Sequence, residues 1–157
     1  MKRSLPCVMA VAVLAVAVPR VPAGDEPQKK PAAPKEAEAI TAIVKSFFDN
    51  LIRSKADQNL ALFVRPEAPV VGIPGGSGVE KIWTKKASEL IEAQKADGAA
   101  ATHTMDSIAV ESVDGALAVA RVKYHTVHVN CRAVFTFSSE GGGWKIAALV
   151  FETRLRE

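Results

Sequence analysis

The C-terminal part of the chain most strongly limits the fold, because it reads as two long strands joined by a short glycine-rich turn. Residues 131–139 (CRAVFTFSS) alternate in character, residues 140–143 (EGGG) interrupt them, and residues 144–155 (WKIAALVFETRL) resume the pattern. Two such runs around a glycine-rich break predict a β-hairpin. The second run is apolar on both faces from Ile146 to Phe151, which is typical of a strand covered on both sides.

A second hairpin is predicted just before the first. Residues 103–113 and 116–127 have strand character, and Asp114-Gly115 between them is a strong signal for a tight turn. A two-residue turn sets the register of this pair, with Ile108 opposite Arg121 and Met105 opposite Tyr124. The sequence therefore predicts four long antiparallel strands in succession.

The clearest helix is predicted over residues 35–54. Its apolar side chains recur every three or four positions, which gives one stripe along the helix: Ile40, Ile43, Val44, Phe47, Phe48, Leu51 and Ile52. The two adjacent phenylalanines make the stripe wide, so we expect it to cover a sheet.

Shorter elements lie between this helix and the four strands. Asp57 is a candidate N-cap for a short helix over residues 58–64, and residues 69–73 (PVVGI) predict a short strand. Residues 79–83 fit either a return strand, which we favour, or the first turn of a longer helix. Residues 85–97 are helical by either interpretation. Helices first and long strands afterwards indicate an α+β fold, in which about three helices pack against a curved antiparallel sheet shaped as a half-cone.

At this level the chain resembles the nuclear transport factor 2-like superfamily, which has a cystatin-like fold. Four segments carry the resemblance: SFFDNLIRSKADQNLALF, PEAPVVGI, DGALAVARVKYH and EGGGWKIAALVFE. The chain looks most like small secreted lumazine-binding-like, polyketide-cyclase-like or ketosteroid-isomerase-like members. The resemblance implies a pocket between the sheet and the helices, and dimerisation through the outer sheet face. It implies no single reaction, because this fold hosts many.

The N-terminus predicts export. Lys2-Arg3 precedes an apolar run over residues 8–18, and small residues up to Ala23 suit a cleavage site, so residues 1–23 resemble a secretory signal. An uncleaved N-terminal anchor is the alternative. Residues 24–35 form a Pro/Lys-rich linker, and one domain follows over residues 36–157. We therefore expect a secreted or periplasmic protein with no stable membrane insertion after cleavage.

Charge gives little support for a nucleic-acid partner. The net charge is +3, but six basic residues lie within residues 1–35 and the rest is close to neutral. The basic patch that nucleic-acid binding requires is not evident, so no nucleic acid is expected.

Candidate catalytic residues lie near one end of the central hairpin. Asp106 and His125 fall on neighbouring strands, and an Asp–His pair there would make a general base whose tautomer the carboxylate fixes. The alternative is an exposed polar strand face with weakly paired charges. His103 and His128 could bind a metal with Glu152 or Cys131, but no close-spaced ligand motif is present, so neither a metal nor a cofactor is expected.

Four other side chains are candidates for ligand binding. Trp83 would lie near the pocket mouth, beside Ile73 and Phe47, where it could stack on a flat ligand or fill the core. Phe47, on the first helix, is the second candidate. Tyr124 is the only tyrosine of the chain, and Glu152 could orient a polar group if its strand face looks inward.

These observations support three hypotheses on function. The first is a secreted domain that binds a small hydrophobic or aromatic molecule in its pocket without catalysis. The second is a dehydratase, isomerase or cyclase that uses the Asp/His base in the same pocket. The third is a dimeric interaction module with a vestigial pocket, whose outer sheet face would be apolar through Val134, Leu149 and Phe151. A homodimer is expected.

Overall fold

The computed structural model describes residues 34–53, 55–75, 81–96, 103–112 and 115–156. The predicted secretory signal and all but the last two residues of the predicted linker lie outside these residues. Within them, no helix is long and apolar enough to cross a membrane.

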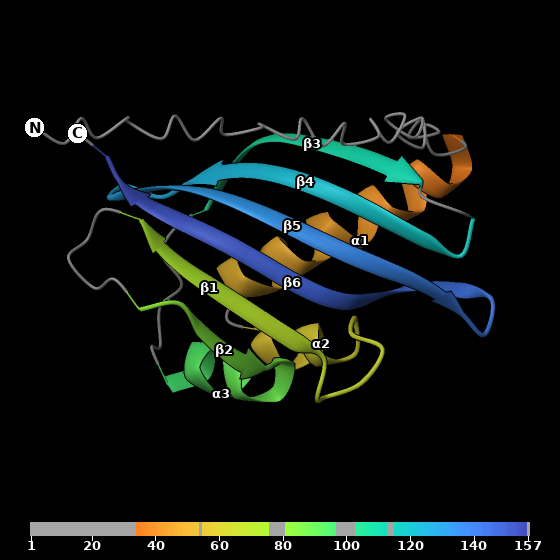
Figure 1. Ribbon diagram of the computed structural model, residues 1–157, viewed down its shortest axis with the longest axis horizontal. Coiled ribbons are helices and arrows are strands. Elements are labelled where there is room, and N and C mark those ends of the chain that lie inside the picture. The colour runs from red at the N-terminus through yellow and green to blue at the C-terminus, as the bar shows by residue number, and fades with distance from the viewer. Residues whose placement is uncertain (1–33, 54, 76–80, 97–102, 113–114, 157) are drawn as a thin grey trace, which may run out of the picture.

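One six-stranded sheet forms the body of the molecule, with the strand order β2-β1-β6-β5-β4-β3. Neighbouring strands are antiparallel, except that β1 runs parallel to β6. The strands are long and curved, and α1 passes behind them in the view of Figure 1. Their bounds are Pro69–Gly75 (β1), Trp83–Lys86 (β2), Thr104–Ser112 (β3), Leu117–His125 (β4), Val129–Glu140 (β5) and Gly143–Leu155 (β6). The α+β fold class with a curved sheet is confirmed.

Three helices lie against the sheet: α1 (Pro34–Ile52), α2 (Ala56–Leu60) and α3 (Ala87–Ala96). The predicted apolar stripe of α1 is buried at Ile40, Val44, Phe47, Phe48 and Leu51, whereas Ile43 is partly buried and Ile52 at the end of the helix is 44% exposed. The rings of Phe47 and Phe135, on β5, meet edge to face with their centroids 5.4 Å apart. The core therefore lies between α1 and one face of the sheet, which we call the inner face.

The short helix α2 begins earlier than expected, and Asp57 does not cap it. Lys55 is at the N-cap position, and no side chain caps the helix. Asp57 instead pairs with Lys95 of α3. The link between α1 and α2 comes from Asn59, which is fully buried, donates to the carbonyl oxygen of Phe47 at 3.1 Å and accepts from Asn50 at 3.0 Å.

The region between α2 and α3 also differs in detail from the sequence pattern. Residues 79 and 80 of the segment for which a return strand was favoured lie outside the described residues. A return strand does pair with β1, but it spans Trp83–Lys86 and shares only Trp83 with the predicted segment. The helix that follows begins at Ala87, two residues later than predicted.

The hairpin between β5 and β6 is confirmed. Glu140 pairs with Gly143, and the two residues between them, Gly141 and Gly142, have φ angles of 64° and 87°. A two-residue turn with positive φ at both positions matches the right-handed twist of the flanking strands. Glycine adopts this conformation without steric strain.

A β-bulge in β6 changes which side chains face inward. Thr136 pairs with Ala148 but Phe137 pairs with Ile146, so Ala147 is an extra residue in β6. As a result Ile146 and Leu149 are both buried, although they are three residues apart. The expectation that Leu149 and Phe151 belong to the outer face is therefore wrong, because strict alternation does not allow for the extra residue.

A second bulge lies in β3. Met105 pairs with Tyr124 as predicted, but Ser107 pairs with Lys123 and Ile108 with Val122, so Asp106 is the extra residue. The predicted pairing of Ile108 with Arg121 is wrong by one residue. The predicted tight turn at residues 114–115 lies partly outside the described residues. Beyond the bulge the predicted register holds, with Met105 opposite Tyr124.

Candidate functional site

A cavity of about 240 Å³ lies between the helices and the inner face of the sheet. Phe47 and Phe48 of α1 and Leu90 of α3 form its helical side, and Phe135 and Leu149 form part of its sheet side. All five side chains are buried or nearly so. The cavity is thus walled mainly by apolar groups.

Aromatic rings form one end of this cavity. The centroids of the Phe48 and Tyr124 rings are 4.8 Å apart, and His103 lies 5.6 Å from Tyr124 and 6.0 Å from Phe48. The three rings are tilted relative to one another. Such an arrangement offers ring faces and edges to a flat molecule.

A few polar groups interrupt the apolar lining. Gln94 of α3 places its side-chain oxygen, Oε1, in a buried position where no donor from the described part of the chain reaches it. The Thr126 hydroxyl is already used, because it accepts from the backbone N–H groups of His128 and Val129 at 3.3 and 3.2 Å. Thr153 adds another hydroxyl to the lining.

Tyr124 and Cys131 pair across β4 and β5 and line the same cavity. Burial raises the pKa of Tyr124 above its ordinary value of 10.0, and the neighbouring Cys131 raises it further. Burial also raises the pKa of the Cys131 thiol, while its interaction with the Tyr124 hydroxyl acts in the opposite direction. The phenol is therefore protonated at neutral pH and can donate a hydrogen bond.

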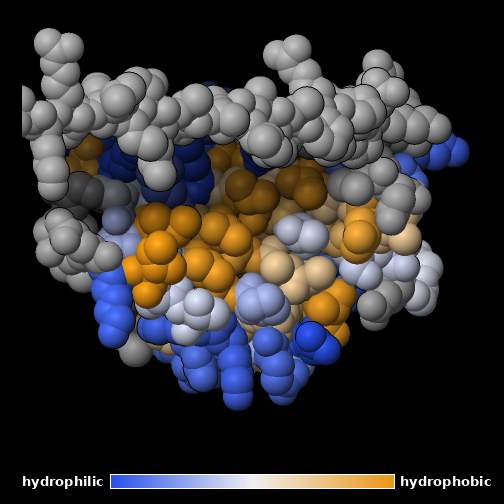
Figure 2. Space-filling view, in the orientation of Figure 1, coloured by the Kyte–Doolittle hydropathy of each residue, from blue (hydrophilic) through white to orange (hydrophobic). Residues whose placement is uncertain are grey.

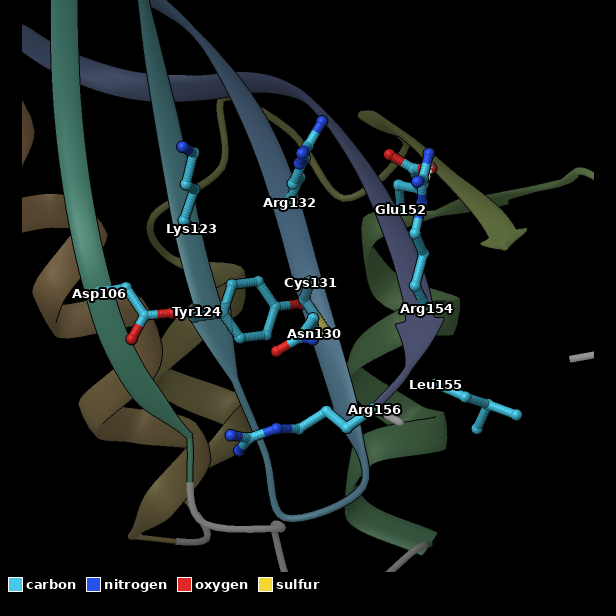
Figure 3. A pocket seen from close by; sticks show the side chains of 10 residues that line it. All are labelled: Asp106, Lys123, Tyr124, Asn130, Cys131, Arg132, Glu152, Arg154, Leu155 and Arg156. Atoms are coloured by element: carbon cyan, nitrogen blue, oxygen red, sulfur yellow. Dashed lines mark hydrogen bonds and ion pairs between the residues drawn. The ribbon is translucent and has the colours of Figure 1, made fainter. Parts of the chain in front are cut away.

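A larger groove of about 600 Å³ lies on the opposite, outer face of the sheet, near the ends of β3 to β6. Its lining is polar and charged, as Figure 3 shows. Glu152 accepts from Arg154 within the groove at 2.6 to 2.7 Å. The groove and the cavity are therefore chemically different spaces on the two sides of one sheet.

The structure brings Asp106 and His125 together at the outer face. Asp106 Oδ1 lies 2.8 Å from His125 Nδ1, and the two side chains are 46% and 29% exposed. Neither residue lines the interior cavity. The bulge at Asp106 places its carboxylate beside His125, which pairs with Thr104 in the same ladder.

The four predicted ligand-binding residues are divided between the two faces. Phe47 and Tyr124 line the cavity, whereas Glu152 lines the outer groove. Trp83 lies over Gly72, where an added Cβ would come within 2.2 Å of the indole ring, and its ring centroid is 5.3 Å from that of Phe151. Trp83 therefore supports Phe151, which lines the cavity, and does not line it itself.

Sequence reasoning missed Gln94, Phe151 and Thr153 as cavity residues. Gln94 falls on the apolar side of its predicted helix, which is a signal that could have marked it as an inward-facing polar group. Phe151 was assigned to the wrong face because no sequence signal marks the bulge at Ala147, and Thr153 was not considered. Among the described residues, no three His, Cys, Asp or Glu side chains lie close enough to hold a metal ion.

Comparison with known proteins supports the same fold. Residues 35–152 match the family model described as "Putative lumazine-binding". No curated protein matches the chain.

Three solved structures illustrate the likeness, each with a TM-score of 0.62. An NTF2-like protein of unknown function from Shewanella baltica is 14% identical, and the match covers 76% of this chain and 94% of that one. An NTF2-like protein of unknown function from Methylobacillus flagellatus is 18% identical, with coverages of 78% and 95%. A cystatin-like fold protein from Burkholderia xenovorans is 15% identical, with coverages of 79% and 95%. At these identities the similarity concerns the fold.

Proposed function

Because the chain belongs to the putative lumazine-binding family, within the nuclear transport factor 2-like superfamily, we propose that its interior cavity binds a small, flat, mostly apolar molecule. The observation that carries this proposal is the cavity between α1, α3 and the inner sheet face. It combines aromatic walls with a few polar atoms, and one of these, Gln94 Oε1, is buried without a donor from the described residues. Mostly apolar pockets with a small number of placed polar groups are typical of ligand sites.

The size of the cavity limits the ligand. Its volume of about 240 Å³ is below the common range of about 300 to 1,000 Å³ for ligand pockets. A molecule with one or two fused rings suits this space, whereas a molecule with a long polar extension would have to project from it. The tilted rings of Phe48, Tyr124 and His103 would contact the faces and edges of such a ligand.

The polar atoms of the cavity suit a heterocycle of the lumazine type, a flat bicyclic ring system with N–H donors and carbonyl acceptors. Gln94 Oε1 would accept from a ring N–H, and the hydroxyl of Thr153 or Tyr124 would donate to a carbonyl oxygen. Burial keeps Tyr124 protonated, so it contributes a neutral donor. Satisfying a buried acceptor on binding favours a ligand that carries a donor over an apolar molecule of the same shape.

Titration of the chain with lumazine, followed by calorimetry and by the fluorescence of the ligand, tests this proposal. The variant Gln94→Leu removes the buried acceptor and keeps a side chain of similar size. We expect it to weaken binding about fivefold to tenfold, in line with the loss of one hydrogen bond of about 1 kcal/mol. Glu92→Gln, an exposed position on the same helix, is the matched control and should bind as the wild type does. Equal affinities of both variants, or no saturable binding, would contradict the proposal.

We propose binding without catalysis at this site. A catalytic role for Asp106 and His125 stays a prediction, and it requires the pair to face an enclosed space that excludes water. Both side chains lie on the outer face, partly exposed and outside the cavity. In such a position a carboxylate–imidazole pair is solvated, and weak surface pairs of this kind are common.

We also infer that the domain acts after export. This inference rests on the sequence alone, because residues 1–23 lie outside the described residues. Mass spectrometry of the chain recovered from a secretion-competent bacterial host should give a mature form that begins after Ala23. Recovery of the full-length chain from the membrane fraction would instead support the uncleaved anchor.

A further inference from the structure

Two basic side chains face each other directly on the outer face of the sheet. Lys123 of β4 pairs with Arg132 of β5 in the antiparallel ladder, and both are exposed. Like charges directly opposite each other across two strands destabilise a sheet. No carboxylate from the described part of the chain lies within ion-pair distance of either residue. The pair therefore presents two positive charges on one exposed part of the sheet.

The two carboxylates that line the same groove are already engaged with other partners. Glu152, which pairs with Arg132 in the ladder, turns to Arg154, and Asp106 contacts His125. With four basic and two acidic side chains, the lining has a net charge of +2. The groove therefore favours an anion, with Lys123 and Arg132 as the uncompensated charges.

The arrangement of donors indicates more than one anionic group. Figure 3 shows the side chains of Lys123 and Arg132 extending in the same direction from neighbouring strands, with Arg156 at the opposite end of the group and Asn130 between them. Arg156 is held in place, because its Nη1 donates to the carbonyl oxygen of Thr126 at 3.2 Å. A guanidinium recognises carboxylate or phosphate oxygens through two parallel hydrogen bonds, and an ammonium adds a point charge.

We propose that this groove is a second binding site, separate from the interior cavity, for a small soluble molecule with two or more negative charges. Phosphate and carboxylate groups share the chemistry that Lys123, Arg132 and Arg156 recognise. The volume of about 600 Å³ lies within the range of small-molecule sites. The proposal does not depend on a ligand in the cavity, because it rests on the other face of the sheet.

Calorimetric titrations with pyrophosphate and with citrate, each at low ionic strength, test this site and distinguish the two chemistries. The variants Lys123→Gln and Arg132→Gln each remove one charge from the groove. Arg121→Gln is the matched control, because it removes the same charge from the same face of β4, but Arg121 pairs with Glu111 and does not line the groove. We expect the groove variants to weaken binding of the preferred probe about tenfold or more, and the control to change it much less.

The proposal would be overturned if neither probe showed saturable binding, or if the control lost as much affinity for the probe as the groove variants did. It would also be overturned if light scattering showed a dimer that binds neither probe. Urea unfolding of the same variants checks their folding. Since Lys123→Gln relieves a like-charge contact, it should be at least as stable as the wild type, so its loss of binding would not come from unfolding.

Discussion

At the scale of single residues, Tyr124 combines several properties of the site. It lines the cavity, contacts the rings of Phe48 and His103, and lies beside the thiol of Cys131. Its inward position follows from the alternation of β4, which the sequence shows clearly. Gln94, by contrast, lies on the apolar side of its predicted helix, but the sequence does not show which hydrogen-bond donors surround its side-chain oxygen in three dimensions.

Tyr124 makes stability sensitive to alkaline pH. The unfolded chain ionises this residue near its ordinary pKa of 10.0, whereas burial keeps it protonated in the folded chain. Above about pH 10 the unfolded state therefore binds fewer protons, and the free energy of unfolding falls by up to about 1.4 kcal/mol per pH unit. Cys131, whose pKa is also raised by burial, adds to this loss, beginning near its ordinary value of 9.0.

Urea unfolding at several pH values from about 8 to 11 measures this effect. The variant Tyr124→Phe should show a flatter dependence of the unfolding free energy on pH. Because the chain has one tyrosine, the absorbance of tyrosinate reports this residue alone, and it should rise only as the chain unfolds. A rise in the folded chain near pH 10 would show that the phenol is accessible to water.

Asn59 offers a second prediction at this scale. Its side chain is fully buried and joins α1 to α2 through two hydrogen bonds. Asn59→Ala leaves the Phe47 carbonyl without this donor, and we expect the free energy of unfolding to fall by about 2 kcal/mol. Gln58→Ala, at the neighbouring exposed position, should change it little. Thermal unfolding of both variants makes the comparison, and equal shifts would show that the buried bonds contribute nothing specific.

At the scale of the elements, the helices and strands could largely be predicted from periodicity. The sequence did not show which side chains of β6 face the core. The stripe on α1 and the glycine turn between β5 and β6 have direct sequence signals. The bulge at Ala147 has none, since this alanine stands in a run of apolar residues that fits either face. The boundary of α2 was misplaced for a different reason, because Asp57 has the residue type of an N-cap but pairs with Lys95 instead.

The bulge in β6 gives a prediction about register. Deletion of Ala147 removes the extra residue, so Phe137–Ile146 and Thr136–Ala148 become consecutive pairs and the ladder runs without interruption. Ile146 and Leu149 are then two residues apart and both stay on the inner face, so we expect the deletion to be tolerated. Ile146→Ala, which leaves a cavity in the core, should lower the free energy of unfolding by about 2 to 5 kcal/mol. Circular dichroism during heating makes the comparison, and a deletion variant as unstable as Ile146→Ala would mean that the fold requires the bulge.

At the scale of the whole molecule, the α+β class and the curved sheet were correctly predicted, because the order of the elements leaves few ways to bury the α1 stripe. The site was predicted only in part. Of the residues predicted to bind a ligand, Phe47 and Tyr124 line the cavity. The presence of separate spaces on the two faces of the sheet depends on the curvature of the sheet, which no local sequence pattern shows.

The homodimer stays a prediction at this scale. Hydrophobic side chains gather across the middle of the face shown in Figure 2, with hydrophilic ones on the side of β2 and α3. On the outer face, three half-buried valines form a row across neighbouring strands: Val71 of β1, Val150 of β6 and Val134 of β5. Light scattering at micromolar concentration should give twice the mass of the chain, and Val150→Asp should reduce it to the single mass. If the wild-type chain is a monomer, the outer face of the sheet is not a dimer interface.

Tyr124 and Cys131 border both the cavity and the groove, so only one layer of backbone separates the two spaces. Any effect that an anion on one side has on the affinity for a ring system on the other must act in reverse by the same factor. If both proposed sites bind their ligands, the sheet would couple the two binding equilibria although the two solutes never touch.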